Sequence, residues 1–188
     1  SENYVQTTER ISDTQVLSTT EYYDGLGRPF EMVEQKKTPD GANLIHLKEY
    51  DGLGRDWKTW LPVKDASDFL SISAARSQGN NQYRDSHAFS LTEYDGSPLN
   101  RINTVEGVGA EWTSHPLKKD YLVNTSKYPL NCKYYRVSMQ GQLQDKGYYP
   151  EGRLYVTKTT DENGNESYEF KNIAGNVILK RTICSIDE

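Results

Sequence analysis

The sequence has no apolar run near the roughly 18 residues that a membrane-spanning helix needs, so no helical span is expected. Cysteine is scarce: Cys132 and Cys184 exclude a disulfide-rich scaffold, and the sequence leaves open whether the two are paired. Lys and Arg number 22 against 27 Asp and Glu, and a net charge of −5 argues against a nucleic-acid partner.

Motifs that carry enzyme chemistry are also missing. The 3 histidines stand in unrelated segments, without H-E-x-x-H or C-x-x-C spacing, so a zinc site is not expected. No G-x-S-x-G marks a nucleophile. We therefore expect neither a catalytic residue, a metal nor a cofactor, and we expect the chain not to be an enzyme.

Hydrophobic residues make up only 35% of the chain, but 14 Tyr and 3 Trp are among them. Aromatic side chains bury large areas. A folded protein with a thin core is expected, in which tyrosine replaces part of the aliphatic material.

A repeated hexapeptide is the strongest pattern. Tyr-Asp-Gly-Leu-Gly-Arg at residues 23–28 recurs unchanged at residues 50–55. A weaker copy at residues 94–99 loses the second glycine and delays its arginine to Arg101. A fourth copy, Phe170–Val177, is aligned with one extra residue before Gly175.

Each copy predicts a β-hairpin. Aspartate favours a turn because its carboxylate hydrogen-bonds the following backbone, and the second glycine supplies a positive φ at Gly27 and Gly54. Period-2 patterns flank the turns. The predicted fold is mainly β, with hairpin units around residues 17–36, 44–61, 89–105 and 153–183.

One stretch departs from this pattern. Residues 62–88 form an insertion in which helical spacing predicts a short helix over 66–78, ended by Gly79. The layout of residues 113–150 is not predicted. A final strand at 177–183 is expected at a sheet edge. The alternation predicts that these residues are buried: Phe30, Met32, Trp57, Leu154, Val156, Val177 and Leu179.

The segments YYDGLGRPFEMV, EYDGLGRDWKTWLPV, EYDGSPLNRI and YYPEGRLYVTKTTDENGNESYEF occur in this order between residues 15 and 183. In that order they resemble the domain of unknown function that precedes the repeat array of bacterial RHS/YD-repeat proteins. The resemblance implies a mainly antiparallel β fold in which successive hairpins form a curled sheet. It also implies a single β-rich domain over 1–188, cut from a longer secreted or cell-surface chain whose signal peptide is removed or lies outside this sequence. No Asp-Pro is present, so the family's self-cleaving core is not implied.

The Asp and Arg residues of the repeat allow a functional and a structural interpretation. Asp24 and Asp51 could be paired catalytic carboxylates, but equivalent positions in a repeated turn favour a structural role. Arg28 and Arg55 could bind an anion, although pairs with the turn aspartates are favoured. The assigned repeat residues are Tyr23, Asp24, Gly25, Gly27, Arg28, Tyr50, Asp51, Gly52, Gly54, Arg55, Phe170 and Gly175.

Two further patterns also have a structural alternative. The loop from Asp161 to Glu166 contains residue types that are common in calcium-binding loops. The position of its glycine differs from that in an EF-hand and favours a tight turn. Exposed aromatic residues could stack on sugar rings, whereas cross-strand packing is the favoured interpretation. The candidate ligand-facing residues are Trp60, Trp112, Tyr148 and Tyr149.

The sequence thus favours a non-enzymatic structural module that begins or caps the hairpin sheet of an RHS/YD-repeat protein. The remainder of its own chain would be its partner, without nucleic acid and without membrane insertion of this segment. The alternative is a module that binds a carbohydrate or another cell-surface ligand.

Overall fold

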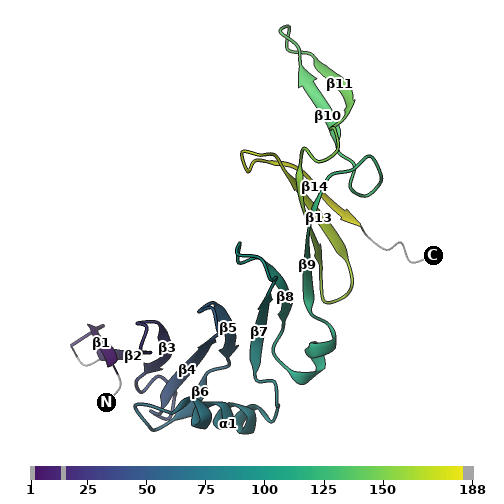
Figure 1. Cartoon of the computed structure of the whole chain (residues 1–188). Coiled ribbons are helices and arrows are strands. Elements are labelled where there is room, and N and C mark those ends of the chain that lie inside the picture. The colour runs from purple at the N-terminus through teal and green to yellow at the C-terminus, as the bar shows by residue number, and fades with distance from the viewer. Residues whose placement is uncertain (1–2, 14–15, 184–188) are drawn as a thin grey trace. The chain divides into compact units, whose positions relative to one another are not determined.

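The computed structural model describes residues 3–13 and 16–183. The chain divides into two compact units: residues 1–101 with 105–114, and residues 102–104 with 115–188. Fourteen strands, one α-helix and one 3₁₀-helix lie in the described ranges (Figure 1). The predicted mainly antiparallel β fold with one short helix is confirmed. The predicted single domain over 1–188 stays a prediction.

The first unit is built on an antiparallel sheet with strand order β1-β2-β3-β4-β5-β7. Strand β6 pairs with the first residues of β4, and β8 lies where the division between the units falls. The bounds are β1 (Asn3–Arg10), β2 (Val16–Tyr23), β3 (Pro29–Glu34), β4 (Asn43–Tyr50), β5 (Asp56–Trp60), β6 (Val63–Asp65), β7 (Phe89–Tyr94), β8 (Ile102–Glu106) and the 3₁₀-helix η1 (Ala110–Ser114).

Helix α1 (Ile72–Tyr83) lies beside β4 and β6 (Figure 1). It begins six residues later than predicted, because Ser71 is the N-cap and its hydroxyl accepts the Ala74 N–H. The predicted stop at Gly79 is wrong. Gly79 is a buried helical residue whose Cβ position would be 3.4 Å from Trp60, so its small size permits the close approach of helix and sheet. The helix ends at Arg84, which adopts φ +53°.

Two groups of buried residues form the core of this unit. One contains Val33, Ile45 and Val63, and the other contains Leu47, Trp60, Ala75, Ala88 and Phe89. Strand β4 shows strict alternation, with Asn43, Ile45, Leu47 and Glu49 all buried. The buried Glu49 accepts the Trp60 indole N–H at 2.6 Å and pairs with Arg76, which fastens α1 to the sheet.

The buried face of β3 is the opposite of the predicted one. Glu31 and Val33 are buried, whereas Phe30 and Met32 are only half-buried. Both faces of this strand carry apolar residues. The face with Glu31 and Val33 becomes the buried one because α1 and the loop before it cover that face. Trp57 is likewise half-buried, with the Lys58 amine 4.4 Å from its ring centroid.

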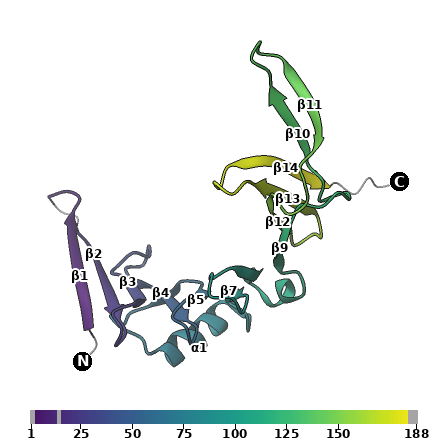
Figure 2. The ribbon, with the colours of Figure 1, turned by 45° about the horizontal axis from the view of Figure 1, so that its top comes forward.

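The second unit contains a sheet of order β9-β12-β13-β14 and a separate two-stranded hairpin, β10-β11 (Figure 2). Its core contains Leu154, Val156, Tyr168, Phe170 and Cys132. The bounds are β9 (Leu117–Val123), β10 (Lys133–Val137), β11 (Leu143–Tyr148), β12 (Tyr155–Thr160), β13 (Glu166–Lys171) and β14 (Val177–Ile183).

The predictions for this unit have mixed outcomes. Burial of Leu154 and Val156 is confirmed, and β14 is the last strand of its sheet, as expected for a final edge strand. Leu179 is half-buried, whereas Val177 is 46% exposed, so its predicted burial is wrong. Val177 directly follows a turn on an edge strand, where only one neighbouring strand is present.

Burial raises the pKa of the Cys132 thiol. Cys184 lies outside the described residues. None of the helices in the described ranges is long and apolar enough to cross a membrane.

The repeated turns as the candidate functional site

The two identical hexapeptides form the same turn. In the first, the Asp24 N–H donates to the Arg28 carbonyl at 3.0 Å and the Gly27 N–H donates to the Asp24 carbonyl at 3.0 Å. In the second, the corresponding bonds of Asp51 are both 2.9 Å. Gly27 and Gly54 have φ +76° and +79°, which confirms the prediction that both occupy a conformation favouring glycine.

The aspartate side chain completes each turn. Asp24 Oδ1 accepts the backbone N–H groups of Leu26 and Arg28, and Oδ2 accepts the Arg28 guanidinium at 2.8 Å. Asp51 has the same three bonds, the last at 2.7 Å. The backbone N–H of the turn arginine is the main cause that lowers the pKa of each carboxyl. Both aspartates are therefore used within their own turns, as the structural interpretation predicts.

The same five-residue turn recurs in further places, most of which the repeat pattern of the sequence does not mark. Each copy has the bond that closes the turn, from the N–H of residue one to the carbonyl of residue five, and a glycine with positive φ at position four. The additional copies span residues 38–42, 138–142, 161–165 and 172–176. At residue 161 this confirms the predicted tight turn, in which Asp161 Oδ1 accepts the N–H groups of Asn163 and Asn165.

The alignment of the fourth copy needs correction. Asn172 occupies the aspartate position, since its Oδ1 accepts the N–H groups of Ala174 and Asn176. Gly175 takes the place of Gly27 and Gly54, so no residue is inserted. Lys171, and not Phe170, precedes the turn as Tyr23 and Tyr50 do. Phe170 is fully buried in the core of its unit.

The third copy is a wider version. The Asp95 N–H donates to the Arg101 carbonyl at 2.8 Å, so the delayed arginine does close the turn. Asn100, with φ +52°, stands directly before it, where the other copies have glycine. Asparagine tolerates this conformation better than most residues.

The turns are joined by contacts between arginine and tyrosine. The Arg28 guanidinium lies 4.5 Å from the ring centroid of Tyr50, which belongs to the next copy. The Tyr50 hydroxyl donates to the carbonyl of Pro29 at 2.6 Å. Tyr50 therefore packs on the arginine of the preceding copy, and it hydrogen-bonds the carbonyl of the residue directly after that arginine.

This contact recurs at the next step. The Arg55 guanidinium lies 4.2 Å from the ring centroid of Tyr94, whose hydroxyl donates to the Asp56 carbonyl at 3.0 Å. Tyr121 makes the corresponding hydrogen bond to the carbonyl of Ile102, the residue after Arg101, at 3.0 Å. Sequence reasoning missed Tyr121, because no aspartate follows it.

The first tyrosine of the series differs. The Tyr23 hydroxyl donates to Glu21 on its own strand at 2.7 Å. The inter-repeat hydrogen bond therefore begins with Tyr50 among the described repeat tyrosines.

The four candidate ligand-facing aromatic residues do not share one environment. Trp60 is only 7% exposed and donates to Glu49, so its expected ligand-facing role is wrong. Tyr149 is half-buried, with its ring centroid 4.7 Å from that of Tyr134. Trp112 and Tyr148 are 47% and 52% exposed, but they belong to different units.

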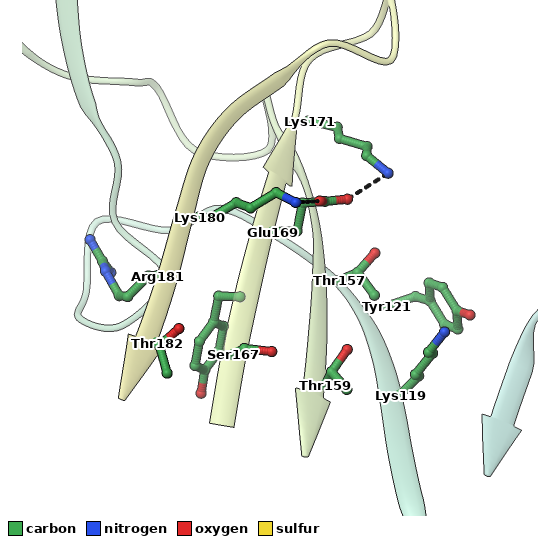
Figure 3. A pocket seen from close by; sticks show the side chains of 11 residues that line it. Lys119, Tyr121, Thr157, Thr159, Ser167, Glu169, Lys171, Lys180, Arg181 and Thr182 are labelled. Carbon is green, nitrogen blue, oxygen red and sulfur yellow. Dashed lines mark ion pairs between the residues drawn. The ribbon is translucent and has the colours of Figure 1, made fainter. Parts of the chain in front are cut away.

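A polar hollow of about 420 Å³ lies on the face of the β9-β12-β13-β14 sheet that carries Thr157 and Glu169 (Figure 3). Glu169 lies between two ammonium groups, 2.6 Å from Lys171 and 2.9 Å from Lys180. Both lysines lower the pKa of its carboxyl. Glu169, Lys171 and Lys180 therefore pair with one another within the hollow.

The model of a domain of unknown function, DUF6443, matches residues 1–125. This chain belongs to the DUF6443 family. A comparison with curated proteins finds no match. The DUF6443 match contains the first three copies of the repeated hexapeptide and both Arg–Tyr contacts. Most of the residues that line the polar hollow lie beyond residue 125.

Proposed function

We propose that this DUF6443 chain is a non-enzymatic structural module that begins or caps the hairpin sheet of a larger, secreted or surface-exposed RHS/YD-repeat protein. The observation that carries the proposal is the contact between copies: Arg28 on Tyr50 and Arg55 on Tyr94, each with a tyrosine hydroxyl bonded to the preceding copy. The motif residues are thus used to join hairpins.

The ends of the series support a starting role. Within the described residues, the Tyr23 hydroxyl bonds to Glu21 on its own strand and not to a preceding copy. Tyr121 repeats the inter-copy hydrogen bond at the far end of the series. A series that begins within the chain and continues through its successive tyrosines fits a module on which further hairpins are built.

The carbohydrate-binding alternative has less support. It requires exposed aromatic rings on a common surface, but Trp60 is buried and Tyr149 is half-buried against Tyr134. The remaining two candidates, Trp112 and Tyr148, lie in separate units.

The test measures protease resistance of the longer protein that the proposal requires, with Arg28→Ala and Arg55→Ala introduced together. We expect faster cleavage both in this module and in the hairpins beyond it, because repeat units stabilise their neighbours. Arg136→Ala is the matched control, since Arg136 contacts Tyr134 within a single hairpin. Cleavage confined to residues 1–188 would contradict the proposal. So would tight glycan binding that Trp112→Ala or Tyr148→Ala abolishes.

A further inference from the structure

The hairpin of β10 and β11 has an exposed apolar tip. Its two strands pair with each other and with no other described strand, and both views show it projecting from the sheet of its own unit (Figures 1 and 2). Val137 and Leu143 face each other across the strands and are each 70% exposed, while Met139 is fully exposed. A two-stranded hairpin is marginally stable alone in water, so this arrangement favours a partner that covers the tip.

The tip is also suited to an apolar surrounding. Residues 137–143 contain no charged side chain. The N–H groups of Ser138 and Gly141 donate within the turn, at 2.8 and 3.0 Å. Those of Gln140 and Gln142 donate to the Ser138 hydroxyl, at 3.3 and 3.1 Å. Backbone groups that are bonded internally remove the main cost of entering a hydrocarbon environment.

Basic side chains stand directly behind the tip. Arg136 and Lys146 are exposed and have no carboxylate partner among the described residues. Lys133 pairs with Asp145 at 3.0 Å. Three basic residues against one acidic residue give the hairpin, residues 133–148, a net positive charge within a chain of net charge −5.

We propose that this tip binds the surface of an anionic lipid bilayer, with Val137, Met139 and Leu143 below the headgroups and Arg136 and Lys146 among the phosphates. The tip is convex and apolar, and cations without a carboxylate partner lie directly behind it. This arrangement fits the deformable, negatively charged surface of a bilayer better than a protein groove of fixed shape. The polar amides of Gln140 and Gln142 keep the insertion shallow. This departs from the sequence expectation of no membrane insertion, and it is independent of the proposed scaffold function.

The first experiment measures flotation of the purified 188-residue chain with vesicles. Binding should be strong with phosphatidylcholine containing phosphatidylglycerol, weak with phosphatidylcholine alone, and reduced by salt. Arg136→Ala and Lys146→Ala should each lower the partition about fivefold. Met139→Asp should abolish binding, whereas Leu26→Asp, at another highly exposed turn tip in the other unit, should not change it. Equal effects of the two aspartate variants would overturn the proposal.

The second experiment reports position. An environment-sensitive fluorophore is attached to Met139→Cys, and separately to Leu26→Cys, in a Cys184→Ser background. Anionic vesicles should shift the emission of the label at 139 to the blue and leave that at 26 unchanged. An unchanged label at 139 overturns the proposal. Self-association detected by sedimentation velocity and lost in Met139→Asp would also overturn it, because the tip would then be covered by a second copy.

Discussion

Replacement of Glu31 by glutamine tests how the loop before α1 is held on the sheet. Glu31 is 2% exposed, and its Oε1 accepts the Leu70 N–H at 3.0 Å. Its Oε2 is buried without a hydrogen-bond partner. The same loop is fastened by the Tyr22 hydroxyl, which donates to the Asp68 carbonyl at 2.7 Å. Glu31 is thus a buried carboxyl at the contact between the loop and strand β3.

Burial raises the pKa of Glu31 from 4.5 to about 7, although the Leu70 N–H opposes the change. Because the folded-state pKa lies above the unfolded one, the contribution of Glu31 to stability is fully present below about pH 4.5. It is lost as the pH rises through about 7. The gap between the two values corresponds to roughly 3 kcal/mol in the free energy of unfolding.

The assay is urea unfolding followed by tryptophan fluorescence, since Trp57, Trp60 and Trp112 all lie in the first unit. Between pH 4 and 8, about 3 kcal/mol of the pH dependence should disappear in Glu31→Gln. The buried amide has a desolvation cost of its own that does not change with pH, so the slope is the diagnostic quantity. The matched control is Glu9→Gln, on the exposed strand β1. Parallel pH profiles for Glu31→Gln and the parent would refute the argument.

Three further experiments test the turns and the second unit. Gly54→Ala and Gly27→Ala should each cost about 1–2 kcal/mol from the positive φ. Gly54→Ala should cost roughly 0.5–1 kcal/mol more than Gly27→Ala, because the Cβ of an alanine at 54 would lie 2.8 Å from the Arg28 guanidinium that packs on Tyr50. Equal losses of the two variants in urea unfolding would argue against this contact. A double-mutant cycle of Arg55→Ala and Tyr94→Ala should give a coupling of about 0.5–1 kcal/mol, whereas additive effects would show that the two side chains act independently. Asn124 is fully buried, accepts the Leu154 N–H at 2.8 Å and donates to the Pro150 carbonyl at 3.0 Å. Asn124→Ala should therefore cost about 1–3 kcal/mol by calorimetry, and an unchanged melting temperature would contradict that role.

The sequence predicts the turns well because their determinants are local. Asp51 and Gly54 are three residues apart, and their side-chain and backbone requirements define the turn without the rest of the chain. The contact between Arg28 and Tyr50 could not be predicted in this way. It depends on which strands become neighbours and in what register, which the hexapeptide alone does not determine.

Burial was harder to predict where both phases of a strand are apolar. In β3, Phe30 and Met32 alternate with Val33, and the position of α1 and the loop before it decides which side becomes core. Gly79 shows the same limit: a glycine that reads as a helix stop is the residue that permits close packing on Trp60. Phe170 was assigned to the repeat because it is aromatic, although the turn begins one residue later than that alignment required.

In the five-residue turn, the residues that stabilise the hairpin are different from those that it exposes to solvent. In the copies that start at Asp24, Ser138, Asp161 and Asn172, position one supplies the hydrogen bonds and position four the backbone conformation, so the side chains at positions two and three contribute little to folding. They are occupied by Gly-Leu, Met-Gln, Glu-Asn and Ile-Ala in different copies. Substitutions at these pairs can therefore diversify the exposed turns at almost no cost in stability. The same positions are suitable for grafted epitopes or randomised libraries.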